Sequence, residues 1–249
     1  MRHVAAVERA LTVLDALSDG SPELGTNEIA RRTGINASTV SRLLATLAQA
    51  GIVEHVSESG RYRLGVRLLQ LANAVLARLD IREVARPHLQ ELVKATGETA
   101  TLSAPGEPDA ITVDFVQSAS SVQSVARVGR PSVAHATATG KVLLAFGTAE
   151  PASGPLKAYT KRTITDRRKL VVELDRVRRN GFADAIGERE QHLNAIAAPV
   201  FGARGDLAAI LGVQGPALRF NREAMRGAVR PLLDRAAEVS ATLGWVTPD

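Results

Sequence analysis

Apolar residues near the start of the chain recur at helical spacing. A stripe with intervals of three or four residues consists of Val4, Val7, Leu11 and Leu14. A loop containing glycine and proline follows at residues 18–22. This pattern predicts an amphipathic first helix whose apolar stripe packs against other elements of the fold.

Two further helices are predicted after this loop. The first covers residues 27–32, with Thr26 as its expected N-cap and Gly34 just past its end. The second begins after Asn36, which is expected to cap it, and ends at Gly51. Its apolar face is formed by Val40, Leu43, Leu44 and Leu47.

The opposite face of this third helix carries short or forked hydrogen-bonding side chains rather than a ring of Glu and Lys. Two short helices around a tight turn, the second with a free polar N-terminal half, form the geometry that places a recognition helix in the major groove. Arg42 can bind guanine O6 and N7 or a phosphate. On the helices, the candidate DNA-binding residues are Thr26, Asn36, Ser38, Thr39, Ser41 and Arg42.

A basic hairpin is predicted directly after the third helix. Residues 52–56 and 61–65 resemble two short strands around a turn that ends in glycine. Such a wing can lie along the DNA backbone, where Arg61 and Arg63 would meet phosphates. All nine basic side chains before Asp80 are arginines, which favours geometric recognition over bulk charge. The alternative is a three-helix module with a hairpin that binds protein rather than DNA.

An apolar stripe continues through a predicted linker helix at residues 66–80. Its members are Leu68, Leu69, Ala72, Val75, Leu76 and Leu79. This apolar stripe must pack against another surface, and a second copy of the chain is the simplest candidate. A homodimer would present two recognition helices to two half-sites of double-stranded DNA, roughly one helical turn or more apart.

Helix and strand patterns alternate from residue 81 onward, which predicts an α+β domain over residues 81–249. Helices are expected at 87–96, 137–146, 167–180 and 221–243, and strands at 99–103, 110–116, 196–201 and 207–213. A turn at residues 202–206 predicts antiparallel pairing of the last two strands. One face of the resulting sheet should be covered by helices.

Composition narrows the possibilities further. A length of 249 residues allows two domains, and 45% hydrophobic with 23% charged residues argues against extensive disorder. The net charge of +5 suits a polyanionic partner, but residues 1–80 are nearly balanced, and the basic run at 157–179 is interpreted as a solvated helix face. No apolar run resembles a membrane span or a signal core, so we expect a cytoplasmic protein with no membrane partner.

Several kinds of chemistry find no support in the sequence. The absence of cysteine excludes disulfides, thiolate metal sites and thiol catalysis. The five histidines lack metal-ligand spacing and no Gly-x-Ser-x-Gly elbow occurs, so no metal or cofactor is expected. Thr137 is expected near the N-cap of the helix ending at Phe146, where backbone N–H groups can hold a carboxylate. Glu188 and Glu190 alternate on a strand or loop, and a catalytic role is the less favoured interpretation of this pair.

Separate strings along the chain occur in the order typical of one family. They are ERAL at 8–11, EIARRTG at 28–34, STVSRLL at 38–44, GRYRLG at 60–65, RVGR at 127–130, HATATGK at 135–141, TITD at 163–166, GFA at 181–183, AAPV at 197–200 and GP at 215–216. On these strings the chain resembles the IclR family of bacterial transcription regulators nearly end to end. The resemblance implies a winged helix-turn-helix domain at 1–65, a linker helix at 66–80 and a GAF-like effector-binding domain at 81–249.

The resemblance also implies an effector pocket on the open, loop-roofed face of the sheet. Its expected residues are Gly129, Ala138, Thr139, Gly140, Asp184, Ala185, Ala195, Gly212 and Gln214. Family positions that often carry an acid, a thiol and two hydroxyls are occupied here by Ala185, Ala195, Gly212 and Gln214. This loss of polar groups favours a bulkier, less polar ligand. Alternatively, Asp184 replaces the missing acid, or the pocket is vestigial.

The sequence therefore predicts a sequence-specific transcription regulator, acting as a repressor, controlled by a small organic acid or a bulkier apolar effector. It binds a double-stranded DNA operator as a homodimer that pairs into a dimer of dimers, and it is not an enzyme. Two alternatives stay open. One is an effector-blind DNA-binding and oligomerisation protein, and the other is an enzyme that transforms a small acid and is targeted to DNA.

Overall fold

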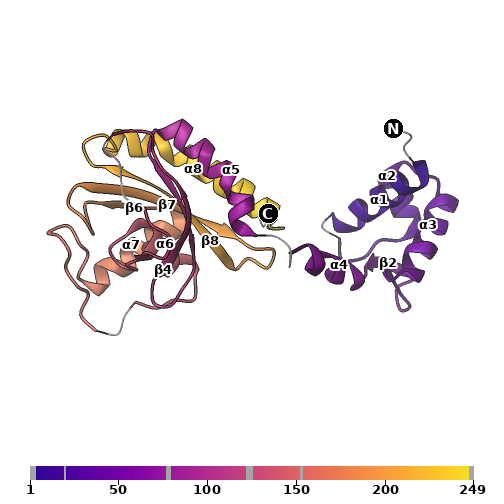
Figure 1. Ribbon diagram of the computed structural model, residues 1–249. Coiled ribbons are helices and arrows are strands. Elements are labelled where there is room, and N and C mark those ends of the chain that lie inside the picture. Colours follow the sequence, from indigo (N-terminus) through magenta and orange to yellow (C-terminus); the bar gives the residue numbers. More distant parts are fainter. Residues whose placement is uncertain (1–3, 20, 77–79, 122–125, 152–153, 247–249) are drawn as a thin grey trace. The chain divides into compact units, whose positions relative to one another are not determined.

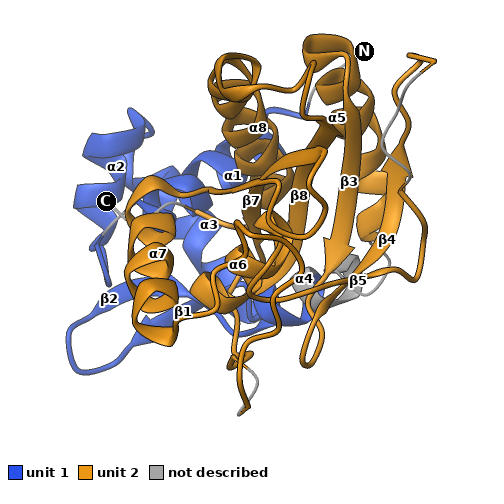
Figure 2. Cartoon of the chain, turned by 90° about the vertical axis from the view of Figure 1, so that its left-hand side faces the viewer, with its two compact units in different colours: residues 1–78 blue, residues 79–249 orange. Residues whose placement is uncertain are grey.

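A computed structural model describes residues 4–19, 21–76, 80–121, 126–151 and 154–246, with no side chains described at 72–76. The chain divides into two compact units, residues 1–78 and 79–249 (Figure 2). The division falls inside the segment predicted to link two domains.

Unit 1 contains helices and one hairpin (Figure 1). The helices are α1 (Ala5–Ser18), α2 (Thr26–Thr33), α3 (Ala37–Gln49) and α4 (Arg67–Leu76), and the strands are β1 (Val53–Val56) and β2 (Arg61–Leu64). The strands pair antiparallel as predicted, with Val53 opposite Leu64. Leu24 adds a bridge to Tyr62 of β2, which ties the loop before α2 to the wing.

The local signals around α2 and α3 are mostly confirmed. Gly34 ends α2 in the left-handed conformation, with φ of 71°. The side chain of Asn36 accepts a hydrogen bond from the Thr39 backbone N–H at 2.8 Å and so caps α3. The prediction for Thr26 is wrong, because α2 begins at Thr26 itself, Gly25 is the N-cap, and no side chain caps this end.

The predicted buried stripe of α1 is wrong within unit 1. Val4, Val7 and Leu11 are 63%, 57% and 56% exposed. The helix instead buries Val13 and Leu17, which join the core formed with α2, α3 and β1. A helix can be amphipathic along two stripes, and the inward one here has the half-buried Ala10 ahead of Val13, a small residue that contributes little to the hydrophobic pattern.

Unit 2 is built on one antiparallel sheet with the strand order β5-β4-β3-β8-β7-β6. Its strands are β3 (Thr99–Ala104), β4 (Ala110–Val116), β5 (Pro131–Ser132), β6 (Ala183–Ile186), β7 (Leu193–Phe201) and β8 (Leu207–Pro216). Its helices are α5 (Ile81–Thr96), α6 (Ala138–Phe146), α7 (Arg167–Asn180) and α8 (Arg222–Thr242). The central hairpin β7–β8 follows the predicted turn, and Val200 lies opposite Ala209.

Helices cover the sheet on both faces (Figure 1). One apolar core lies between the sheet and helices α5 and α8. A second core joins the other face to α6, which lies over β6, β7 and β8, and to α7, which packs against α6. The face predicted to be open is therefore only partly open, and the uncovered part lies toward β3 and β4.

Several element boundaries differ from the prediction. Helix α5 begins at Ile81 rather than at residue 87, because the Asp80 carboxylate accepts a hydrogen bond from the Arg82 N–H at 2.9 Å and caps an additional segment. Pro87 therefore lies inside the helix. The short strands β5 and β6 were not predicted, whereas α7 and β4 have the predicted bounds. Among the described residues, no helix has the length and apolar character needed to cross a membrane.

Candidate functional site

Helix α3 exposes the polar face predicted from the sequence. Ser38, Ser41 and Arg42 are exposed, whereas Val40 and Leu44 of the same helix are fully buried. The Ser38 hydroxyl donates to the capping side chain at 3.0 Å, which fixes the start of the helix. No hydrogen bond or ion pair engages the Arg42 guanidinium among the residues that the structure describes. This side chain is therefore available to a ligand of unit 1.

The remaining candidates of unit 1 are less accessible. Thr26 is half-buried in the first turn of α2, and Thr39 is half-buried on α3. Asn36 is exposed, but its side-chain oxygen is occupied by the cap. A role in binding DNA stays a prediction for each of these three residues.

Both wing arginines are held by carboxylates. Arg61 lies 2.7 Å from Glu28 of α2. Arg63 binds both oxygens of Glu54 on the neighbouring strand, at 3.0 Å each. The hydrogen bond from Arg61 lowers the pKa of Glu28, and that from Arg63 lowers the pKa of Glu54. The wing therefore presents ion pairs rather than free cations.

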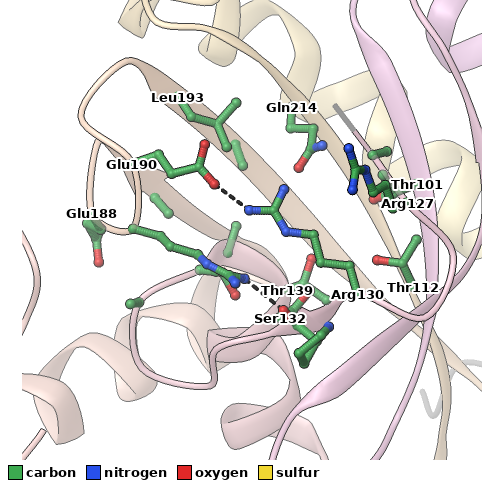
Figure 3. A pocket seen from close by; sticks show the side chains of 18 residues that line it. Thr101, Thr112, Arg127, Arg130, Ser132, Thr139, Glu188, Glu190, Leu193 and Gln214 are labelled. Atoms are coloured by element: carbon green, nitrogen blue, oxygen red, sulfur yellow. Dashed lines mark hydrogen bonds and ion pairs between the residues drawn. The ribbon is translucent and has the colours of Figure 1, made fainter. Parts of the chain in front are cut away.

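Unit 2 contains a cavity at the uncovered part of the sheet (Figure 3). Its wall comes from strands β3, β4, β6, β7 and β8, the segment around residues 126–132, the segment leading into α6 with the start of that helix, and the loop between β6 and β7. The volume open to the centre of a water molecule is about 60 Å³, several times what one water needs. Its polar and charged lining residues are Thr101, Thr112, Arg127, Arg130, Ser132, Thr137, Thr139, Glu188, Arg189, Glu190 and Gln214.

Five of the predicted effector residues line this cavity. They are Ala138, Thr139, Ala185, Ala195 and Gln214. The other four, Gly129, Gly140, Asp184 and Gly212, do not contribute to its wall. Gly212 is adjacent to this wall. A Cβ at this position would come within 2.7 Å of the hydroxyl oxygen of Thr101, which lines the cavity.

Asp184 cannot serve as the replacement acid in this geometry. Its carboxylate forms an ion pair with Arg176 of α7, and its backbone carbonyl accepts a hydrogen bond from Lys141 at 2.9 Å. Because side chains alternate along a strand, Ala185 faces the cavity while Asp184 does not.

Gly140 has a packing role at the start of α6. A Cβ here would lie 2.4 Å from the Val133 carbonyl oxygen and 2.5 Å from Ala134 Cα, both backbone atoms. The hydroxyl of Thr137 accepts the Gly140 N–H at 2.9 Å and caps the helix, as predicted. The glycine thus allows the capped end of α6 to contact the preceding segment closely.

The change Gly140→Ala should lower the thermal midpoint of unit 2, because overpacking typically costs 1–3 kcal/mol. The matched control is Gly227→Ala in α8, where a Cβ would meet nothing within 4 Å. That change should stabilise the protein by roughly 0.5–1 kcal/mol through helix propensity. Thermal melting followed by circular dichroism measures both. An equal gain in stability for the two variants would contradict the packing role.

The three arginines of the cavity were not predicted from the sequence. The cavity is not depleted of polar groups, so that part of the prediction is wrong. Arg130 forms an ion pair with Glu190, and Arg189 donates to the Pro131 carbonyl at 2.7 Å (Figure 3). Burial and then repulsion by Arg130 lower the pKa of Arg189. The RVGR string contained the signal for Arg130, but only its glycine was selected.

A buried ion cluster supports one wall of the cavity. Lys141 of α6 is 1% exposed, and its Nζ lies 2.7 Å from Glu188 and 3.0 Å from Glu173. Burial raises the pKa of Glu188, and the attraction of Lys141 offsets only part of this effect. Burial also opposes ionisation of Glu173, but Arg176 and Lys141 together lower its pKa to about 2. Glu188 and Glu190 therefore bind different cations.

Comparison with known proteins identifies both units. The sequence profile of the IclR helix-turn-helix domain matches residues 6–57, and that of the bacterial transcriptional regulator IclR C-terminal domain matches residues 73–241. The HTH-type transcriptional regulator KdgR of Escherichia coli K12 is 33% identical over 247 residues, which cover 97% of this chain and 94% of that protein.

Solved structures agree with this assignment. An IclR transcriptional regulator of Silicibacter sp. TM1040 is 30% identical, with a TM-score of 0.85 and coverage of 98% of each chain. An IclR homolog of Microbacterium hydrocarbonoxydans, solved in complex with 4-hydroxybenzoate, is 26% identical, with a TM-score of 0.59 and coverage of 96% of this chain and 99% of that one. The protein described here belongs to the IclR family of bacterial transcriptional regulators.

Proposed function

We propose that the protein is a repressor that binds a DNA operator through α3 and the wing and responds to a small organic acid bound in unit 2. The observation that carries the DNA-binding role is the exposed polar face of α3 with the available guanidinium of Arg42. Forked donors of this kind read guanine in the major groove. The wing then lies along the phosphate backbone, with Arg61 and Arg63 exchanging their carboxylate partners for phosphates.

The effector role rests on the chemistry of the cavity. Arg127, Arg130 and Arg189 line it, and guanidinium groups bind carboxylates in a two-pronged geometry. The hydroxyls of Thr101, Ser132 and Thr139 add hydrogen-bonding groups. The ligand in the Microbacterium homolog is itself a carboxylate. This lining favours a small acid over the bulkier apolar ligand.

A binding role is favoured over catalysis. The two carboxylates of the loop between β6 and β7 form ion pairs, Glu190 with Arg130 and Glu188 with Lys141, which favours a role in holding the cavity wall over general base catalysis. Incubation of the effector with the protein should return the compound chemically unchanged. A turnover product, identified by mass spectrometry, would support the enzyme alternative instead.

Formation of a homodimer would bury exposed apolar side chains of unit 1. Val4, Val7 and Leu11 of α1 are more than half exposed, as is Leu69 of α4 at 65%. Burial of such rows removes apolar area from water and places two α3 helices for two half-sites. A dimer of dimers would add affinity through multivalency. Sedimentation velocity distinguishes monomer, dimer and tetramer.

The central experiment compares operator and random DNA. Fluorescence anisotropy is measured with labelled DNA from the region flanking the protein's own gene and with a shuffled fragment, at about 150 mM salt and then higher. We expect the native fragment to bind roughly a hundredfold or more tightly, the scale that separates specific from non-specific sites. Equal binding to both fragments that disappears with salt would leave only non-specific attraction and overturn the proposal.

Effector control has its own readout. A bound acid stabilises the native state and raises the thermal midpoint. The same acid should shift the operator-binding curve, with release of DNA expected for a repressor. Acids that bind unit 2 but leave operator affinity unchanged would support the effector-blind alternative.

A further inference from the structure

The charged side chains that line the cavity carry more positive than negative charge. This excess narrows the class of small acid that the cavity can bind, and the inference rests on the proposed function. Arg127, Arg130 and Arg189 face two carboxylates, Glu188 and Glu190. Glu188 is already bound at 2.7 Å by a lysine outside the cavity wall. That lysine is shared with Glu173, so Glu188 and Glu190 together balance at most two of the three guanidinium charges.

These cations occupy two places in the cavity. Arg130 and Arg189 interact electrostatically, and Arg189 is anchored by the Pro131 carbonyl at 2.7 Å. Arg127 lies on the side of Thr101, away from Glu190 (Figure 3). A single carboxylate of a small molecule can satisfy one of these places, because an ion pair requires near contact.

Glu190 weakens the binding of a single carboxylate at Arg130 and Arg189. Its carboxylate already pairs with Arg130 in the ligand-free protein. A ligand with one carboxylate at this end competes with that internal pair and gains little new charge pairing. A second carboxylate that reaches Arg127 forms an ion pair for which the described residues supply no competing carboxylate. A ligand with two carboxylates therefore gains more binding energy than a ligand with one.

The space between the two places suits a short carbon chain. Five alanines contribute methyl groups to the wall: Ala126, Ala136, Ala138, Ala185 and Ala195. The volume of about 60 Å³ open to water centres is enough for several water molecules and accommodates a short chain. We infer that the effector is a small dicarboxylate, with one carboxylate bound by Arg130 and Arg189, the other by Arg127, and its carbon chain against the alanines.

The test uses the full chain and matched pairs of acids. Isothermal titration calorimetry compares malonate, succinate and glutarate with propionate, butyrate and pentanoate, which have the same carbon numbers, at constant ionic strength. The variant Arg127→Gln removes the second anchor. The control Arg168→Gln removes the same charge from an exposed position on α7, outside the cavity.

At least one dicarboxylate should bind about tenfold or more tightly than its matched monocarboxylate, the effect of one charged hydrogen-bonded contact. Arg127→Gln should weaken that dicarboxylate by a similar factor and leave the monocarboxylate within about twofold. Arg168→Gln should change neither. Equal binding of the two classes, a preference that survives Arg127→Gln, or no binding of any dicarboxylate at millimolar concentration would each overturn the inference.

Operator binding by the same preparation separates this inference from the proposed function. If the protein binds its operator and another kind of acid releases it, the proposed function stands and the dicarboxylate assignment falls. If operator binding itself fails, the proposed function falls, while calorimetry still decides whether the cavity prefers two carboxylates.

Discussion

Replacement of Arg42 by alanine should weaken operator binding by roughly five- to 150-fold for each recognition helix, corresponding to about 1–3 kcal/mol for a guanidinium that reads a base. The side chain is exposed on α3 with no intramolecular partner among the described residues, so the change should leave folding unaffected. In a homodimer both half-sites lose the contact. The measurement is fluorescence anisotropy with operator and shuffled DNA across a salt series.

The pattern of the loss identifies the contact. A base contact is lost only on the operator, whereas a phosphate contact weakens operator and shuffled DNA alike and reduces the salt dependence by about one unit of slope. The control Arg9→Ala removes the same charge from an exposed position on α1. If Arg42→Ala and the control bind the operator with the same affinity, Arg42 does not contact the DNA.

Replacement of Lys141 by methionine should produce the largest loss of stability in unit 2, about 3–5 kcal/mol. Methionine retains the length of the side chain but leaves Glu173 and Glu188 without their shared buried cation. The exposed Lys169 of α7 provides the control, since Lys169→Met should fall within about 0.5 kcal/mol of the parent. Urea and thermal unfolding followed by circular dichroism measure both.

Two further observations separate charge from packing in this cluster. The double change Lys141→Met with Glu188→Gln should recover part of the loss, because one uncompensated carboxylate is removed. The deficit of Lys141→Met should also shrink as pH falls from 7 toward 5. Burial already raises the pKa of Glu188, and without the lysine nothing offsets this effect, so protonation of Glu188 favours the folded chain. A loss that is independent of pH and of Glu188 would indicate packing alone.

Features fixed by neighbouring residues were predictable from the sequence. Asn36 caps α3, Gly34 ends α2, and β1 and β2 form the predicted hairpin, because each feature depends mainly on residues close by in the sequence. The buried side of α1 was not predictable in the same way. Either stripe of the helix could face inward, and the choice depends on how α2 and α3 pack against it.

The charges of the cavity required the tertiary fold. Arg130 and Glu190 are distant in sequence and meet only because β5 and the loop after β6 lie at one open face of unit 2. The family resemblance located the cavity, and five of the nine residues it suggested line the wall. It did not reveal that arginines from other positions restore the polarity lost at Ala185 and Ala195.

The ion pairs of the wing should affect how long the protein stays on non-operator DNA. When Arg61 or Arg63 turns to a phosphate, it releases Glu28 or Glu54 beside the polyanion, where the freed carboxylate is repelled. If the proposed wing contacts form, random DNA would offer the wing only this near-balanced exchange, and chance encounters should be brief. An operator would also hold α3 in register and keep the wing engaged. We therefore expect the paired arginines to shorten residence on wrong sites more than on the right one.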